Sequence, residues 1–220
     1  MLARHLNEFK SDEFDYIVID ECHHATNNIS KAIMNYFQSG FILGLTATPE
    51  RMDNQDVFSL FENNVPFELR LRDAIINDLV VPFHYYAIKD DFADYSSYDK
   101  SKMAREIAKS ANVDFIASQI EKYKKSNEKL KCIAFCTSID HANLMANELA
   151  ILGYEAVALT GSNNLGERIK AFNDLQNDEN PLEIICTVDI LNEGVDIPAV
   201  NMVLFLRPTE SSTIFLQQLG

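Results

Sequence analysis

Short apolar runs alternate with stretches of helical periodicity along most of the chain. In its first part, strand-like runs at about 16–19 and 41–45 flank a helical pattern at about 30–37. Further helices are predicted at about 51–61 and 73–79, the second ending before Pro82, and a strand is predicted at about 84–89. A strand, a helix and a second apolar strand are typical of a βαβ unit. The pattern therefore predicts part of a parallel α/β lobe.

A second alternating set follows residues 90–101, which are rich in Asp, Ser and Tyr and show no periodicity. We expect a long amphipathic helix at about 102–125, helices at about 140–152 and 165–175, and strands at about 132–135, 156–159, 182–186 and 202–205. The fold class predicted is α/β with two parallel-sheet lobes, the first incomplete. Residues 1–89 are expected to form the C-terminal part of the first lobe, 90–128 an interlobe linker and helix, and 129–220 a truncated second lobe.

Two carboxylates directly follow the first predicted strand. Asp20 and Glu21 come after the run at 16–19, where a parallel sheet has its carboxyl edge and such folds bind phosphates and metal ions. Mg²⁺ prefers oxygen ligands and keeps several waters, so one carboxylate can hold the ion while its neighbour orients the attacking water. We interpret Asp20 as the metal ligand and Glu21 as the base of an NTPase. An acidic pair alone is more often a solvated loop, but the preceding strand and Thr-Ala-Thr at 46–48 favour the site.

Three motifs then carry a resemblance to a known family. Residues 20–23, Asp-Glu-Cys-His, resemble the DEAH-type motif II of superfamily two helicases, and residues 46–48 resemble their motif III. Residues 190–198, which include Glu-Gly-Val-Asp, resemble motif V, and residues 211–220 resemble the opening of motif VI. The motifs follow the family's order. The resemblance implies two RecA-like lobes that face one cleft, with ATP and Mg²⁺ as cofactors.

The resemblance also implies roles for individual residues. The catalytic residues would be Asp20, Glu21 and His23, and the nucleotide-binding residues would be Thr46, Thr48, Gly194, Asp196 and Gln217. Thr46 and Thr48 would connect the carboxylates to the opposite lobe, and His23 would relay the same contact; Thr48 also suits a helix N-cap. Nucleic-acid backbone contacts are implied at the strand ends, at Thr137, Thr160, Gly161 and Thr187. Ordinary strand-end turns explain each of these four residues equally well.

Two parts of the family pattern do not occur in the 220 residues. The chain contains no G-x-x-x-x-G-K-[ST] loop, and it stops one residue before the first arginine of motif VI. Both parts stabilise charge during phosphoryl transfer. We therefore expect a piece of an ATP-dependent helicase, related to bacterial restriction-enzyme motor subunits, that is inactive in isolation. The alternatives are a nucleotide-independent binding or scaffold module and the motor of a nuclease that translocates without unwinding.

Composition refines this picture. The chain is 47% hydrophobic and has no apolar run of membrane-spanning length and no signal peptide, so we expect a cytoplasmic protein. Its net charge of −14 predicts weak nucleic-acid binding by this piece, because phosphate contacts need Lys and Arg. DNA, rather than RNA, is the expected partner of the complete protein.

A lysine cluster at 122–131 is interpreted as a solvated helix end. The four cysteines are interpreted as reduced core thiols, and Cys22 lacks a second Cys/His pair at zinc-finger spacing.

Overall fold

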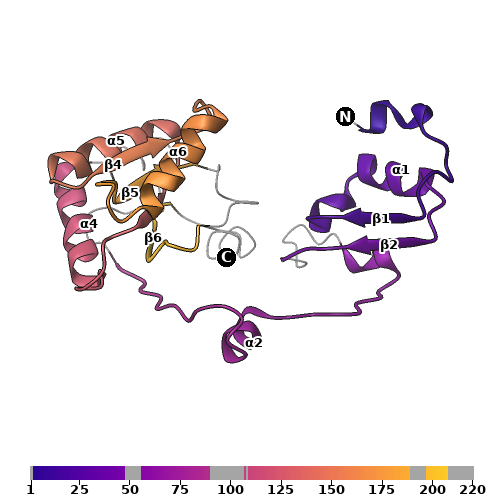
Figure 1. Ribbon diagram of the computed structural model, residues 1–220, viewed down its shortest axis with the longest axis horizontal. Coiled ribbons are helices and arrows are strands. Elements are labelled where there is room, and N and C mark those ends of the chain that lie inside the picture. Colours follow the sequence, from indigo (N-terminus) through magenta and orange to yellow (C-terminus); the bar gives the residue numbers. More distant parts are fainter. Residues whose placement is uncertain (1, 48–55, 90–106, 108, 189–196, 208–220) are drawn as a thin grey trace. The chain divides into compact units, whose positions relative to one another are not determined.

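The computed structural model describes residues 2–47, 56–89, 107, 109–188 and 197–207 (Figure 1). Its contacts divide the chain into two compact units, Met1–Ala87 and Ile88–Gly220. Each unit contains a parallel sheet, as the alternation of strands and helices predicts. Among the helices that the structure describes, none combines the length and the apolar character that crossing a bilayer requires.

The first unit is built on a two-stranded parallel sheet. β1 (Tyr16–Ile19) pairs with β2 (Phe41–Gly44) in a register that sets Ile19 opposite Gly44. α1 (Asn28–Tyr36) connects the strands and begins at Asn27, whose side chain accepts a hydrogen bond from a backbone N–H of the first turn. Three 3₁₀ turns complete the region: η1 (Leu2–Arg4), η2 (Leu6–Glu8) and η3 (Cys22–Thr26). The strand–helix–strand unit thus lies where the sequence predicts it.

The remainder of the first unit differs from the prediction. Among the described residues of the expected 51–61 helix, only a 3₁₀ turn forms, η4 (Phe58–Phe61). α2 (Leu71–Ile76) is shorter than predicted, and Asp78 just beyond it has a positive φ of 55°. The strand predicted at 84–89 is wrong, because these residues are exposed and have no regular structure. Aromatic residues favour a strand locally, but this preference is weak and depends on how the side chains pack in the fold.

The second unit contains a four-stranded parallel sheet in the order β4-β5-β3-β6. The strands are β3 (Cys132–Phe135), β4 (Ala156–Leu159), β5 (Ile184–Thr187) and β6 (Met202–Phe205). Every residue of the two central strands, β3 and β5, is buried. All strands run in the same direction, so their carboxyl ends lie at one edge of the sheet.

Helices cover both faces of this second sheet (Figure 1). The helices are α4 (Ser110–Tyr123), α5 (Ile139–Ile151) and α6 (Leu165–Gln176). Cys132 and Ala134 of β3 share one core with residues of α4 and α5, whereas Ile133 and Phe135 pack on the face that carries α6. The alternation follows from the two-residue period of a strand. Because α4 packs in this core, it is a component of the second unit.

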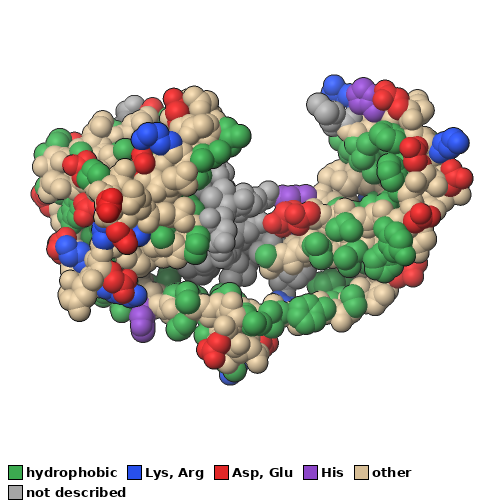
Figure 2. Space-filling model, in the orientation of Figure 1, with side chains coloured by type: hydrophobic (Ala, Val, Ile, Leu, Met, Phe, Trp, Pro, Cys, Tyr) green, Lys and Arg blue, Asp and Glu red, His purple; other side chains and the backbone are tan. Residues whose placement is uncertain are grey.

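The lysines that follow α4 make structural contacts. Lys131 is buried, and its Nζ lies 2.9 Å from the carbonyl oxygen of Gln176 and 2.6 Å from Asp178 Oδ1. Lys124 and Lys125 each pair with a nearby glutamate in the sequence. On the visible face of the second unit, basic and acidic side chains are interspersed (Figure 2). Lys124 and Lys125 directly follow α4, as a helix end predicts, whereas the buried Lys131 lies just before β3, so the interpretation as a solvated helix end is wrong for Lys131.

Candidate functional site

The acidic pair lies where β1 ends. Glu21 has a left-handed backbone, with φ 47° and ψ 47°, and directly precedes η3. Its N–H donates to Asp20 Oδ1 at 2.9 Å, and its carbonyl oxygen accepts from the His24 N–H at 2.9 Å. This conformation costs a non-glycine residue about 1–2 kcal/mol. The resulting turn keeps both residues at the carboxyl edge of the sheet instead of extending the strand.

His23 connects the acidic pair to the end of β2. The imidazole is buried, and its Nδ1 lies 2.9 Å from Thr46 Oγ1 and 3.2 Å from Glu21 Oε2. The short distance to Thr46 is a hydrogen bond, and the Glu21 carboxylate lies within ion-pair distance of the same nitrogen. The His24 ring packs against this imidazole, with the centroids 4.0 Å apart. One buried ring therefore contacts both the candidate base and the hydroxyl of the motif-III-like segment.

Backbone contacts fix this arrangement. The Leu45 N–H donates to the Ile19 carbonyl at 2.9 Å, and the Cys22 N–H donates to the Leu45 carbonyl at 2.9 Å, so pairing continues past both strands. Gly44 leaves room for the side chains of Phe61 and Cys22, because a Cβ there would lie 2.4 Å from Phe61 Cζ and 2.9 Å from the Cys22 sulfur. Burial raises the pKa of the Cys22 thiol. Cys22 is thus a packing residue beneath the site.

The donor atoms suit magnesium chemistry. Asp20 is exposed and Glu21 is half-buried, so hard oxygen ligands are present at the sheet edge. Within the described residues, no group of three or more His, Cys, Asp and Glu could hold a metal ion. Mg²⁺ commonly takes one or two carboxylates and completes its shell with water and substrate phosphates. The pair fits that mode of binding. The predicted nucleotide-binding residues Thr48, Gly194, Asp196 and Gln217 lie outside the described residues.

The predicted nucleic-acid-binding residues lie at the carboxyl edge of the second sheet. Thr137 follows β3, Thr160 and Gly161 follow β4, and Thr187 ends β5. Thr187 is fully buried, and Thr160 is 3% exposed, with its Oγ1 2.7 Å from Ser162 Oγ. Thr137 is half-buried and Gly161 is exposed. Only the last two therefore reach the surface, although all four share one edge.

Two residues that the sequence did not single out hold this edge in place. Arg168 Nη2 donates to the Gly161 carbonyl at 3.0 Å. His141 Nδ1 accepts from the Thr137 N–H at 3.1 Å and lies 3.0 Å from Thr137 Oγ1. A weak signal was available, since both lie near the start of a helix that follows a predicted strand end. Polar side chains at such positions can reach back to the preceding loop.

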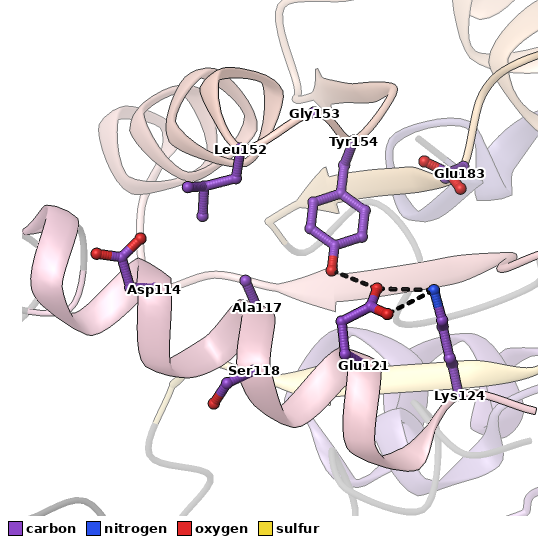
Figure 3. Close-up of a pocket in the computed structure, with 9 residues that line it drawn as sticks. All are labelled: Asp114, Ala117, Ser118, Glu121, Lys124, Leu152, Gly153, Tyr154 and Glu183. Carbon is purple, nitrogen blue, oxygen red and sulfur yellow. Dashed lines mark hydrogen bonds and ion pairs between the residues drawn. The ribbon is translucent and has the colours of Figure 1, made fainter.

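A groove of about 530 Å³ lies at the opposite end of the second sheet (Figure 3). Figure 3 shows Tyr154 and Lys124 converging on Glu121 of α4, with the Tyr154 hydroxyl donating at 2.8 Å and Lys124 Nζ donating at 2.7 Å. The hydrogen bond from Lys124 and, to a lesser extent, that from Tyr154 lower the pKa of the Glu121 carboxyl. The lining residues Tyr154 and Glu183 precede β4 and β5, so the groove lies at the amino ends of the strands. It is separate from the carboxyl edge of the same sheet, which carries Thr137 and Gly161.

The sequence of this chain is similar to those of helicases and restriction-enzyme subunits. A sequence-family model described as "Type III restriction enzyme, res subunit" matches residues 2–51, and one described as "Helicase conserved C-terminal domain" matches residues 111–220. The "Type I restriction enzyme EcoAI endonuclease subunit" of Escherichia coli is 27% identical over 95% of this chain and 29% of that subunit. The "Putative ATP-dependent helicase IRC3" of Saccharomyces cerevisiae is 23% identical over 100% of this chain and 33% of that protein.

A solved structure shows the same fold. A fragment structure from Vibrio vulnificus YJ016, described as "a putative HsdR subunit of a type I restriction enzyme", aligns with 97% of this chain and 41% of that chain. The TM-score is 0.72 at 24% sequence identity. The chain spans less than half the length of each of these relatives. The helicase C-terminal family model covers half of the 220 residues of this chain. The chain therefore belongs to the helicase family and has relatives among type I restriction enzyme subunits.

Proposed function

We propose that this chain is part of an ATP-dependent helicase or translocase that couples Mg-ATP hydrolysis to movement along DNA. The observation that carries the proposal is the contact of one buried imidazole, His23, with both Glu21 and Thr46 at the end of the first sheet. A solvated acidic loop has no need of a buried histidine that bridges two strand ends. Membership of the helicase family supports the same activity.

Each residue of the first site has a proposed role. Asp20 would hold Mg²⁺ through a carboxylate oxygen, and Glu21 would orient the attacking water and accept its proton. Bound Mg²⁺ supplies charge neutralisation for the phosphates. His23 would hold the Glu21 carboxylate and the Thr46 hydroxyl in one arrangement, so that a change in the position of either group would shift the other. Thr48, Gly194, Asp196 and Gln217 are proposed as further nucleotide contacts on the strength of the motifs alone.

Residues 129–220 are proposed as the second lobe, which grips the nucleic acid. Its exposed edge residues, Thr137 and Gly161, are the proposed direct contacts to the phosphate backbone. Thr160 and Thr187 have buried side chains and would instead shape that edge. Relatives among type I restriction enzyme subunits support DNA as the partner. The four cysteines are all buried and free, which suits the reducing cytoplasm that we propose as the location.

Replacing Glu21 tests the proposal. In the full-length protein, Glu21→Gln keeps the size of the side chain but removes the base, so ATP binding should persist while steady-state ATPase falls by at least about 100-fold. Glu8→Gln is the matched control, because Glu8 is exposed and contacts its neighbour His5. This control should retain activity. Unchanged turnover in Glu21→Gln would refute the role of Glu21.

A further inference from the structure

The imidazole of His141 occupies an unusual position in the second unit. It lies in the first turn of α5, directly after the strand end that carries Thr137, and it is fully buried. Its backbone N–H donates to the N-cap oxygen of Ser138 at 3.1 Å, which fixes the start of the helix. The ring therefore has little freedom to move relative to Thr137.

The hydrogen bonds identify which ring nitrogen carries the proton. The Thr137 backbone N–H donates to Nδ1 of His141, so Nδ1 is unprotonated and the proton of the neutral ring is on Nε2. Burial lowers the pKa of His141 to about 4, so the neutral form persists at physiological pH. Nε2 is itself buried and forms no hydrogen bond with the residues that the structure describes. The side chain thus uses a single nitrogen, Nδ1, and directs it at Thr137.

Two donors of Thr137 converge on that one nitrogen. The backbone N–H lies 3.1 Å and the hydroxyl oxygen 3.0 Å from Nδ1. An unprotonated imidazole nitrogen has one lone pair in the plane of the ring, so the two donors share it. If the hydroxyl proton turns to another acceptor, the N–H still satisfies Nδ1. The Thr137 hydroxyl is therefore a donor that can be released at small cost, on a half-buried residue at the carboxyl edge.

We propose that His141 is a positioning residue for nucleic-acid binding: it fixes the main chain and side chain of Thr137 so that the hydroxyl can donate to a phosphate oxygen of the bound strand. This inference rests on the proposed function of the same edge. His141 acts through Thr137 and does not touch the strand. When the strand binds, the Thr137 hydroxyl keeps its proton but redirects its hydrogen bond from Nδ1 to the phosphate oxygen, and the N–H alone then donates to Nδ1.

Four single variants of the full-length protein, and the double variant that combines His141→Leu with Thr137→Val, separate this role from simple packing. His141→Leu removes the acceptor, whereas His141→Asn keeps an acceptor oxygen near the place of Nδ1. Thr137→Val removes the hydroxyl but keeps the N–H, whereas Thr137→Ser keeps both. The measured quantities are the Kd for a single-stranded oligonucleotide, its salt dependence, and the thermal unfolding of each variant.

We expect His141→Leu and Thr137→Val each to weaken binding about 5- to 10-fold, as the loss of one hydrogen bond predicts. His141→Asn and Thr137→Ser should stay within about two-fold of the natural protein, and the Leu/Val double variant should be no weaker than either single variant. The slope of log Kd against log salt should not change in any of them, because no charged group is altered.

Several outcomes would overturn the inference. Equal weakening by His141→Asn and His141→Leu would show that the ring acts only by filling space, and unchanged binding by Thr137→Val would remove the proposed hydroxyl contact. Additive losses in the double variant would show that the two residues act independently. If His141→Leu does not fold, the Asn and Val variants still decide. Failure of the natural protein to bind a strand would refute the proposed function itself, whereas binding with unaffected variants refutes only the role of His141.

Discussion

His23 Nδ1 lies 2.9 Å from Thr46 Oγ1, although 23 positions separate the two residues in the chain. The distance is short because β1 and β2 are parallel neighbours and both residues follow their carboxyl ends. The same nitrogen lies 3.2 Å from Glu21 Oε2. Removing the Thr46 hydroxyl can therefore change the position of the Glu21 carboxylate through His23.

The Thr46 hydroxyl should affect turnover more than nucleotide affinity. Thr46→Val keeps the shape of the side chain but removes its hydrogen bond with His23, so we expect kcat for ATP hydrolysis in the full-length protein to fall about 10-fold. The Kd for ATP should change by less than about two-fold. Thr46→Ser retains the hydroxyl and serves as the control. Equal loss of kcat in the Ser and Val variants would contradict the role assigned to this bond.

Glu21 should be required for ATP turnover although its backbone conformation lowers the stability of the first unit. Its left-handed φ of 47° is unfavourable for any residue with a Cβ. Glu21→Gly and Glu21→Ala both remove the carboxylate and should both abolish ATP turnover. The Gly variant should be more stable than the Ala variant by about 1 kcal/mol, because glycine adopts this conformation readily. Hydrogen exchange of amides in β1 and β2 measures the difference, and an Ala variant as stable as the Gly variant would argue against strain at this turn.

Gly44 should not tolerate a methyl group. A Cβ would lie 2.4 Å from Phe61 Cζ and 2.8 Å from Phe61 Cε2. Gly44→Ala should therefore destabilise the first unit by about 1–3 kcal/mol through overpacking, and adding Phe61→Leu should recover part of the loss. Gly40→Ala is the control, since its nearest such contact is an ordinary 3.7 Å to the Asp15 carbonyl. Denaturant unfolding of the three variants, followed in the first unit, tests the prediction. Equal losses in Gly44→Ala and Gly40→Ala would mean that the clash is not responsible.

The stability of the second unit should depend on pH through His141. Its pKa is lowered by burial from 6.5 to about 4, so between these values the unfolded chain binds a proton that the folded protein excludes. The free energy of unfolding is therefore unaffected by protonation of His141 above pH 6.5. Between pH 6.5 and 4 it falls by about 1.4 kcal/mol per pH unit, or about 3 kcal/mol in total. His141→Asn removes the titrating group and should flatten the decline. Identical slopes in both proteins between pH 6.5 and 4.5 would contradict the prediction.

Much of the fold was predictable because its causes are local. The central strands of the second unit are continuous apolar runs, the helices carry periodic apolar faces, and Asn27, Ser138 and Asn164 are good N-caps. The placement of Asp20 and Glu21 after an apolar strand was likewise readable from neighbouring residues. The strand predicted at 84–89 was wrong for the complementary reason: its aromatic residues favour extended backbone, but this local preference is overridden by how side chains pack in the fold.

The sequence by itself determined the order of the elements, the acidic pair and the motifs that place the chain among helicases. Only the tertiary structure decided which of the strand-end residues are accessible, burying Thr160 and Thr187 while leaving Thr137 and Gly161 at the surface. It also joined His23 to Thr46 and His141 to Thr137. The physical reason is that periodicity and capping act over a few residues, whereas burial and side-chain hydrogen bonding depend on which strands become neighbours in the sheet.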